Sequence, residues 1–357
     1  MFHKKTIKDI DVKNKVILVR TDYNVPLKDG VVTSDLRIRA SLPTINYLLE
    51  HGATKIILIS HLGRPDGARQ PELSLAPVAK VLAELLPGHP VEFVGDVSGP
   101  DVERAVDNLS QGGILLLENL RFFSGEEKDS ADFAAELIES THADIFVQDG
   151  FAVIHRAHAS TSAITKDLPS VAGLLLEKEV STLTQVSENP DSPVLVIIGG
   201  AKVDDKQPLI DHFLAKAEAI AVGGKIAADG YTASNDKIYV ATDFAENDEG
   251  TKLDIGPAST AHIVELVNSA QTIIWNGVLG LVEQPEFATS SLAVARAIGQ
   301  RQGITSVICG GDTAGFVENL AEQEPDLQYS LISTGGGASL ELLSGLHLPG
   351  LDALEDK

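Results

Sequence analysis

The sequence predicts an α/β protein with two doubly wound, Rossmann-like parallel-sheet domains that are joined by a helical hinge. Three observations lead to this fold class. Short apolar, β-branched runs recur along the whole chain, and the intervals between them leave room for helices. The chain has 357 residues, of which 43% are hydrophobic, and this length exceeds what one hydrophobic core usually supports.

The expected strands are nine apolar runs: VILV (16–19), IILI (56–59), ILLL (114–117), IFV (145–147), VLVII (194–198), IAV (220–222), IYVA (238–241), TIIW (272–275) and SVI (306–308). Runs that are apolar throughout are typical of parallel strands, because helices cover both faces of such a sheet. Between the runs, residues 43–52 and 75–88 show helical periodicity. Pro77 and the pair Pro87-Gly88 fit the two ends of the second helix.

Four segments follow from this pattern: an N-terminal domain over 1–170, an interdomain helix and hinge over 171–192, a C-terminal domain over 193–340, and a C-terminal segment over 341–357. The hinge is expected where helix-like AGLLLEKEVSTLTQVSE leads into turn-forming NPDSP before a new strand. From Ser344 on, glycine and proline indicate an irregular tail.

Composition excludes several classes of protein. The net charge of −23 argues against nucleic acid or an anionic membrane as a partner, because both need clustered Lys and Arg. The start, MFHKKTIKDIDVKNK, is polar, and no apolar run is long enough to span a bilayer, so we expect a cytoplasmic protein. The single cysteine, Cys309, excludes an internal disulfide framework. We expect a monomer that acts on small molecules.

Charge is distributed unevenly along the chain. Residues 1–175 contain 18 Lys and Arg against 24 Asp and Glu, whereas residues 176–357 contain 10 against 27. Eight of the ten arginines lie in the first half. Arginine is suited to bidentate binding of carboxylate and phosphate, so an anionic ligand is expected there.

Polar side chains follow four expected strands of the first half, at the edge where parallel sheets bind ligands. These segments are Arg20-Thr21-Asp22-Tyr23-Asn24, Ser60-His61-Leu62-Gly63-Arg64-Pro65, Glu118-Asn119-Leu120-Arg121, and Asp149-Gly150-Phe151 leading to His155-Arg156-Ala157-His158. One such segment alone is usually a solvated loop, but four together predict a shared anion pocket. For Arg20, a structural ion pair is an equal alternative.

In the second half, glycine takes the place of arginine. The corresponding segments are Gly199-Gly200-Ala201-Lys202-Val203-Asp204-Asp205-Lys206, Gly223-Gly224-Lys225, Asn276-Gly277 and Gly310-Gly311-Asp312-Thr313. Glycines let backbone amides approach phosphate or a flat base, which predicts a nucleotide site. Neither GxxxxGK[ST] nor GxGxxG is present.

Four side chains in these segments suggest phosphate and metal chemistry. If a helix begins near Lys202, this residue and Lys206 share one helical face and both reach a phosphate chain. Asp312 and Thr313 offer oxygen ligands for magnesium, with helix capping by Asp312 as the alternative.

Taken together, these segments resemble the phosphoglycerate kinase family from about Lys15 to Leu354. The motifs that carry the resemblance are RTDYNVPL, DLRIRASLPTI, SHLGRP, ENLRF, HRAHAS, GLLLEKE, GGAKVDDK, DIGP, WNG, GGDT and STGGGASLELL. The resemblance implies that the acid substrate binds to the first domain and the nucleotide to the second, and that the C-terminal segment returns to the first domain. It implies Mg²⁺-dependent, in-line phosphoryl transfer between 1,3-bisphosphoglycerate and ADP, giving 3-phosphoglycerate and ATP, with hinge closure.

The resemblance also implies roles for individual residues. The acid substrate is bound by Asp22, Asn24, Arg37, His61, Arg64, Arg121 and Arg156. The nucleotide is bound by Gly200, Ala201, Lys202, Lys206, Gly223, Asn276, Glu283, Gly310, Gly311, Asp312 and Thr313. The catalytic set is Arg37, Lys202, Gly311 and Gly336, in which Lys202 neutralises the transferring phosphoryl group. Asp312 positions Mg²⁺ through the nucleotide.

Three departures from the family pattern fall on the nucleotide side. The family usually has a third glycine, a methionine and a long excursion where Gly223-Gly224-Lys225 here leads quickly to IYVA. Val278 replaces a proline, and Cys309 replaces a glycine. These changes predict weaker binding of the adenosine part or tolerance of another base.

Two rival hypotheses remain at this point. A non-catalytic relative that keeps the fold to bind ligands is disfavoured because Lys202, Arg37 and Asp312 are intact. A nicotinamide-dependent dehydrogenase is disfavoured because GxGxxG is missing.

Overall fold

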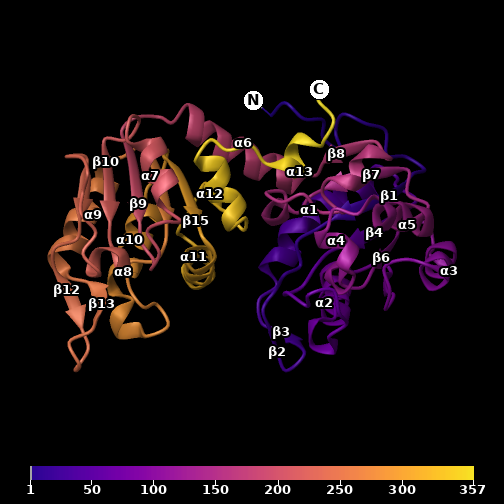
Figure 1. Cartoon of the computed structure of the whole chain (residues 1–357), viewed down its shortest axis with the longest axis horizontal. Helices are drawn as coiled ribbons and strands as arrows, with labels where there is room; N and C mark the ends of the chain where they lie inside the picture. The colour runs from indigo at the N-terminus through magenta and orange to yellow at the C-terminus, as the bar shows by residue number, and fades with distance from the viewer. Residues whose placement is uncertain (1) are drawn as a thin grey trace. The chain divides into compact units, whose positions relative to one another are not determined.

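The computed structural model describes residues 2–357, which divide into two compact units (Figure 1). The first unit runs to Val180 and also contains His347–Lys357, whereas the second is Ser181–Leu346. The point of division falls inside one helix, α6 (Leu174–Glu188). In residues 2–357, no helix combines the length and the apolar character that crossing a bilayer requires.

The first unit is built on a six-stranded sheet in which every neighbouring pair is parallel. In spatial order its strands are β5 (Val91–Phe93), β6 (Gly113–Leu116), β4 (Lys55–Ile59), β1 (Val16–Arg20), β7 (Ile145–Gln148) and β8 (Ser170–Ala172). A small antiparallel hairpin, β2 (Leu27–Lys28) and β3 (Val31–Val32), lies outside this sheet.

Helices cover both faces of this sheet. They are α1 (Leu36–Glu50), α2 (Ala76–Leu85), α3 (Pro100–Asn108), α4 (Ser124–Glu127), α5 (Ala131–Thr141) and α13 (Pro349–Asp352), with 3₁₀ turns at Pro71–Leu73, Leu120–Phe122, Phe151–Val153 and Ala163–Lys166. Alternate strand residues point to opposite faces. Ile17 therefore packs with Ile45 of α1 in one core cluster, while Leu18 packs with Val106 of α3 in the other. A buried face on each side explains why the strands are apolar throughout.

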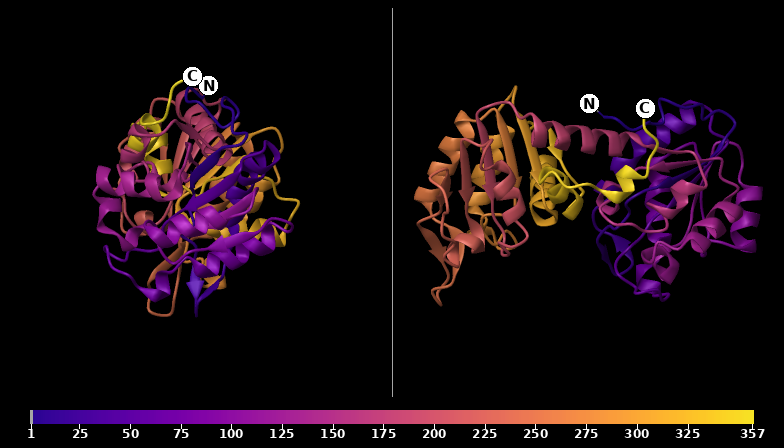
Figure 2. Two further views of the ribbon diagram at one scale, coloured as in Figure 1. Left: turned by 90° about the vertical axis from the view of Figure 1, so that its right-hand side faces the viewer. Right: turned by 45° about the horizontal axis from the view of Figure 1, so that its top comes forward.

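The two terminal segments of the chain run side by side in the first unit (Figure 2). Lys4 forms an antiparallel bridge with Asp356, and the Lys5 amide donates to the Glu355 carbonyl at 2.8 Å. The tail is more regular than expected from its glycines and prolines, because Pro349 begins the short helix α13.

The second unit repeats the architecture. In spatial order its parallel sheet contains β11 (Ile238–Val240), β10 (Ala219–Val222), β9 (Val194–Ile198), β14 (Thr272–Asn276), β15 (Thr305–Cys309) and β16 (Leu331–Ile332). An antiparallel hairpin of β12 (Phe244–Glu246) and β13 (Lys252–Ile255) is added to it. The helices are α7 (Gln207–Phe213), α8 (Gly224–Ala228), α9 (Pro257–Ser269), α10 (Thr289–Gly299), α11 (Gly311–Gln323) and α12 (Gly337–Leu343), with a 3₁₀ turn at Pro285–Phe287.

The predicted fold class is confirmed: both units are doubly wound parallel-sheet domains. Each of the nine apolar runs lies in or overlaps a strand. The strands β5, β8 and β16 were not predicted, because β5 and β8 each contain a polar residue and β16 has only two residues, so none forms a recognisable apolar run. The first helix begins at Leu36 rather than near Pro43, which lies inside it.

Candidate active site

The four polar segments of the first unit lie at one edge of its sheet. In the strand order β6-β4-β1-β7 these strands are neighbours, and all are parallel, so their carboxyl ends meet at the same edge. The structure thus brings together residues that are up to about 130 positions apart in sequence. The polar loops that follow these four strands therefore lie next to one another at this edge.

Asp22 orients Arg37 at this edge. The Arg37 guanidinium forms an ion pair with the Asp22 carboxylate, which is 4% exposed in its side chain. The other Asp22 oxygen accepts a hydrogen bond from the Asn24 amide at 3.1 Å, and the Asn24 side-chain oxygen accepts from the Gly63 amide at 2.9 Å. Two strand-end loops are therefore held together by hydrogen bonds through Asn24.

Arg121 lies among other cations. Its Nη1 donates to the Gly63 carbonyl at 2.9 Å, and its Nε lies 3.3 Å from Glu127. Burial lowers the pKa of Arg121, and the nearby charges of Arg156 and Arg64 lower it further, although Glu127 opposes the shift. Arg64 and Arg156 are themselves exposed. This concentration of positive charge creates a strong site for an anion.

Arg20, at the end of β1, is completely buried and lies 3.8 Å from the equally buried Glu126. This contact is the structural ion pair that the sequence left open for Arg20. Burial lowers the pKa of Arg20 to about 10, so its guanidinium remains charged. The same side chain also contacts His61, with Nη2 3.2 Å from Nδ1.

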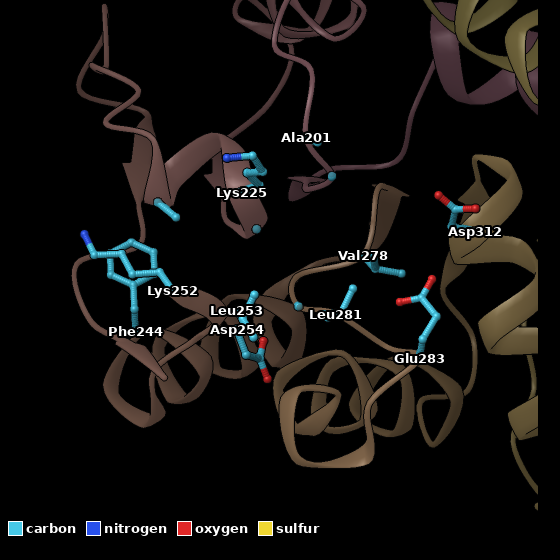
Figure 3. Close-up of a pocket in the computed structure, with 14 residues that line it drawn as sticks. Ala201, Lys225, Phe244, Lys252, Leu253, Asp254, Val278, Leu281, Glu283 and Asp312 are labelled. Atoms are coloured by element: carbon cyan, nitrogen blue, oxygen red, sulfur yellow. The ribbon is translucent and has the colours of Figure 1, made fainter. Parts of the chain in front are cut away.

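The second unit contains a pocket of about 240 Å³ at the carboxyl edge of its sheet (Figure 3). Four of the sequence-predicted nucleotide residues line it: Gly200, Ala201, Glu283 and Asp312. The carboxylates of Glu283 and Asp312 lie on one side of the pocket, and Phe244 and Lys252 lie on the opposite side (Figure 3). Glu283 and Asp312 thus give one end of the pocket negative charge.

Sequence reasoning missed the wall that the hairpin β12–β13 forms. Phe244, Lys252 and Leu253 line the pocket, as do Lys225 and Leu281. The Lys252 ammonium lies 4.4 Å from the centre of the Phe244 ring, within cation–π distance. The sequence signal for this wall is the motif DIGP, residues 254–257, which begins in β13.

Asp254 of that motif anchors the wall. It accepts hydrogen bonds from the Ser290 amide at 3.1 Å and from the Ser290 hydroxyl. Burial raises the pKa of Asp254, and these hydrogen bonds oppose the shift. A side chain at Gly280 would collide with the Asp254 carboxylate, at 2.3 Å, so glycine is required there.

Gly199 and Gly277 let the chain segments after the adjacent strands β9 and β14 approach each other closely beside the pocket. Gly277 has φ +98°, and a Cβ on it would lie 2.2 Å from the carbonyl oxygen of Gly199. Side chains other than hydrogen would force the loops after β9 and β14 apart. This close approach holds the backbone of Gly200 at the pocket wall.

The other residues predicted for this site do not line the pocket. Lys206 donates to the Asn276 side-chain oxygen, the Asn276 amide group lies 3.2 Å from Cys309 Sγ, and the Thr313 hydroxyl accepts from the Gly277 amide at 2.9 Å. Burial lowers the pKa of Lys206, although Cys309, Asp205 and Asp312 oppose this shift. Gly223, Gly310 and Gly336 precede α8, α11 and α12, and Gly311 is the first residue of α11.

Lys202 and Lys206 do not share a helical face. Helix α7 begins only at Gln207, and the segment before it is a turn. Gly200, two residues before Lys202, has φ +83°, which is outside the right-handed helical range, and regular helix geometry is reached only at Gln207. Lys202 is exposed, directly after Ala201 at the pocket wall.

The donor set suits magnesium only when the metal is held by a nucleotide. In residues 2–357, no three or more His, Cys, Asp or Glu side chains are grouped as they would be around a metal ion. Asp312 contributes one carboxylate to the pocket. Magnesium is usually bound by one or two carboxylates together with substrate phosphates, and Asp312 fits this arrangement.

Fold and sites together define a class: an α/β protein with two doubly wound domains, of which the first has an arginine-rich sheet edge and the second a pocket lined in part by glycine. The family model described as "Phosphoglycerate kinase" matches residues 7–238 and 227–346. The chain belongs to the phosphoglycerate kinase family.

Individual relatives agree along the whole chain. The phosphoglycerate kinases of Dictyoglomus turgidum and Fervidobacterium nodosum are 40% and 41% identical, over 99% of this chain and 100% and 99% of their own lengths. The solved phosphoglycerate kinase structures from Pyrococcus horikoshii and Coxiella burnetii have TM-scores of 0.85 and 0.78, at 29% and 31% identity. The two structural alignments span 99% and 98% of this chain, respectively, and 98% of each solved chain.

The chain is therefore a phosphotransferase that transfers a phosphoryl group reversibly between 1,3-bisphosphoglycerate and ADP, giving 3-phosphoglycerate and ATP, a step of glycolysis. These findings favour the kinase over both the dehydrogenase and the non-catalytic relative.

Proposed function

We propose that the arginine-rich edge of the first unit binds 3-phosphoglycerate or its acyl phosphate, and that the pocket of the second unit binds ADP or ATP. The observation that carries this proposal is that the sheet edges of the two units present different chemical groups. Cationic Arg37 and Arg121 gather with the neutral His61 at the sheet edge of the first unit, and glycine backbone gathers at the sheet edge of the second. The acid substrate is gripped by Asp22, Asn24, Arg37, His61, Arg64, Arg121 and Arg156.

The chemistry requires neutralisation of charge rather than proton transfer. The carboxylate of 3-phosphoglycerate is already a nucleophile, so no histidine need act as a general base. Arg37 lies at the reacting carboxyl group, Lys202 neutralises the moving phosphoryl group, and the amides of Gly311 and Gly336 donate to its oxygens. Binding and alignment by these groups supply most of the rate enhancement in phosphoryl transfer.

The residues of the second unit hold the nucleotide with its metal ion. Lys206 binds a nucleotide phosphate, Asn276 and Glu283 bind the nucleoside, and the backbone of Gly200, Ala201, Gly223 and Gly310 and the hydroxyl of Thr313 complete the site. Asp312 holds Mg²⁺ through the nucleotide. When bound, the ion shields charge on the phosphate oxygens.

Transfer requires two substrates on different units to meet in the absence of water, so α6 is proposed as the hinge of a closing motion. We also propose that the enzyme is a monomer in the cytoplasm and that it binds neither nucleic acid nor membranes. The net charge of −23 supports the last point.

A coupled assay with 3-phosphoglycerate and Mg-ATP tests the proposed site. Arg121→Met should raise the KM for 3-phosphoglycerate and leave that for ATP unchanged, while Asp312→Asn should do the reverse. Equal effects of either variant on both substrates would show that the sites are assigned wrongly.

A second proposal concerns the base. The alignment with the Dictyoglomus turgidum relative has 404 positions and this chain has 357 residues, so at least 47 positions are gaps in this chain. The family model also matches in two pieces that overlap at 227–238, a stretch that begins at the end of α8 beside the pocket wall. We infer that the adenosine part is held more weakly than usual in the family, or that another base is accepted.

Comparison of KM values for ADP, GDP and IDP tests this second proposal. Values within about tenfold of one another support it. Strong and exclusive use of ADP would count against it.

A further inference from the structure

Arg20 and His61 are placed against each other by the pairing of two central strands. Arg20 is the last residue of β1 and pairs with Ile59 of β4, and His61 follows two residues later. Arg20 is fully buried and His61 is 4% exposed. The Arg20 Nη2 atom lies 3.2 Å from Nδ1 of His61. This contact is a hydrogen bond in the interior, where an unmatched polar atom would be costly.

The donors and acceptors of the two side chains determine the direction of this bond. A guanidinium has five N–H donors and no acceptor, so Nδ1 of His61 must be the acceptor. Burial holds the pKa of His61 well below its usual value, and the positive charges of Arg20, Arg121 and Arg37, with His158, lower it further. The ring is therefore neutral, and its single proton resides on Nε2.

Glu126 keeps Arg20 in place. Its carboxylate is fully buried, and Oε1 lies 3.8 Å from Nη2 of Arg20. The carboxylate is held in turn by Ser160, whose hydroxyl donates to Oε1 at 2.6 Å and whose amide donates to Oε2 at 3.1 Å. Oε1 also lies 3.8 Å from Nδ1 of His158. Arg20 therefore has a fixed and fully buried counter-ion.

We propose that Arg20 is a positioning residue that holds His61 in the Nε2–H tautomer, so that His61 presents an N–H donor to the anionic acid substrate. The opposite tautomer would direct a nitrogen lone pair at a carboxylate or phosphate oxygen, which repels it. Arg20 thereby acts on substrate binding through His61 without touching the substrate. This inference rests on the proposed role of His61 in binding 3-phosphoglycerate.

The tautomer can be measured without substrate. Protein labelled with ¹⁵N-histidine is examined by long-range ¹H–¹⁵N correlation spectroscopy, and His61→Gln identifies the signals of His61 among the ten histidines. We expect a neutral ring with the proton on Nε2 across pH 6–8. A proton on Nδ1, or a mixture of both tautomers, in the unmodified protein would overturn the proposal.

Variants of Arg20 test the consequence for binding. Arg20→Lys keeps a side chain that only donates, so the tautomer should be retained and the KM for 3-phosphoglycerate should stay within about twofold. The double variant Arg20→Met with Glu126→Gln removes both buried charges together, which avoids an unpaired carboxylate. It should give a mixed tautomer and raise that KM about tenfold, the effect of one hydrogen bond to a charged group.

Controls separate this inference from the proposed function. Arg104→Met removes an exposed arginine of the same unit, and KM values for 3-phosphoglycerate and Mg-ATP should not change. In the double variant, the KM for Mg-ATP should also stay constant. If His61→Gln leaves the KM for 3-phosphoglycerate unchanged, the proposed role of His61 in binding fails. If that KM rises but the double variant keeps the pure Nε2–H tautomer, only the role of Arg20 fails. If the double variant does not fold, the unmodified protein and Arg20→Lys decide.

Discussion

Single residues shape this molecule in two ways: by the space that they leave for the backbone, and by the charge that they place at strand ends. Gly277 and Gly199 belong to the first kind, because their missing side chains permit the loops after β9 and β14 to approach each other closely. Lys202 belongs to the second kind, because its side chain is exposed beside the pocket wall and is not part of the hydrophobic core. The two kinds respond differently to substitution.

Gly277→Ala should destabilise the second unit by more than the strain of its positive φ alone. A left-handed conformation costs an alanine roughly 1–2 kcal/mol, and the new Cβ would also collide with Gly199 at 2.2 Å. Gly230→Ala is the matched control, because its φ is +92° and no atom lies within 4 Å of the added Cβ. Urea unfolding followed by Trp275 fluorescence measures both. Equal losses for the two variants would contradict the collision.

Lys202→Ala should lower kcat by about 10²–10³-fold, the typical effect of removing one group that stabilises charge in a transition state. The unfolding free energy should change by less than about 0.5 kcal/mol, as for other exposed sites. The exposed Lys80→Ala serves as control. A near-normal kcat in Lys202→Ala would contradict the proposed role of Lys202 in neutralising the phosphoryl group.

Among the elements, α6 has a start that depends on a buried acid. Asp149, after β7, accepts hydrogen bonds from the amides of Leu175 at 3.0 Å and Leu176 at 3.3 Å. These amides belong to the first turn of α6, where the helix leaves N–H groups without partners. Burial raises the pKa of Asp149 to about 7, while Thr44 and the two amides oppose the shift.

The stability of the first unit should therefore depend on pH through Asp149. Since the folded pKa is raised, the stabilisation is fully present below the unfolded value of about 3.9 and is lost as pH rises through 7. Relative to Asp149→Asn, the unmodified protein should lose roughly 2–3 kcal/mol between pH 5 and pH 8. Urea unfolding at a series of pH values measures this difference. The exposed Asp167→Asn should show none, and a constant offset for Asp149→Asn would refute the prediction.

At the scale of the whole molecule, the ends of the chain complete the first unit. Leu348 and Leu354 of the C-terminal segment are 1% and 3% exposed. The Gly350 amide donates to the Ile154 carbonyl at 2.8 Å, and the Glu355 amide donates to the Ser170 carbonyl at 3.1 Å. The segment thus supplies apolar surface to a unit from which it is separated by the entire second unit in sequence.

Deletion of residues 347–357 should destabilise the first unit by roughly 3–6 kcal/mol, because two buried leucines are lost at about 1.5–3 kcal/mol each. The single tryptophan, Trp275, reports on the second unit, so circular dichroism should show an earlier transition while the fluorescence transition stays in place. Lys5→Met, which removes only the ion pair with Glu355, should cost less than about 1 kcal/mol. A shift of the fluorescence transition by the same amount would contradict the prediction.

The parts of the fold and site that sequence predicted share a physical cause. Burial on both faces makes central strands continuously apolar, and anion binding concentrates arginine or glycine directly after them, so both signals are local. The hairpin wall of Phe244 and Lys252 carries no such signal, because its two short strands are partly exposed and gain their role only from what they pack against.

The sequence by itself determined the class of fold, the strands of both sheets with more than three residues, and the family, because each depends on residues that are close together along the chain. Only the tertiary structure decided that Arg20 contacts His61 and that Asp149 holds the start of α6. These contacts join residues that are 41 and 26 positions apart. Strand order and burial select such pairs, and a linear pattern does not contain that information.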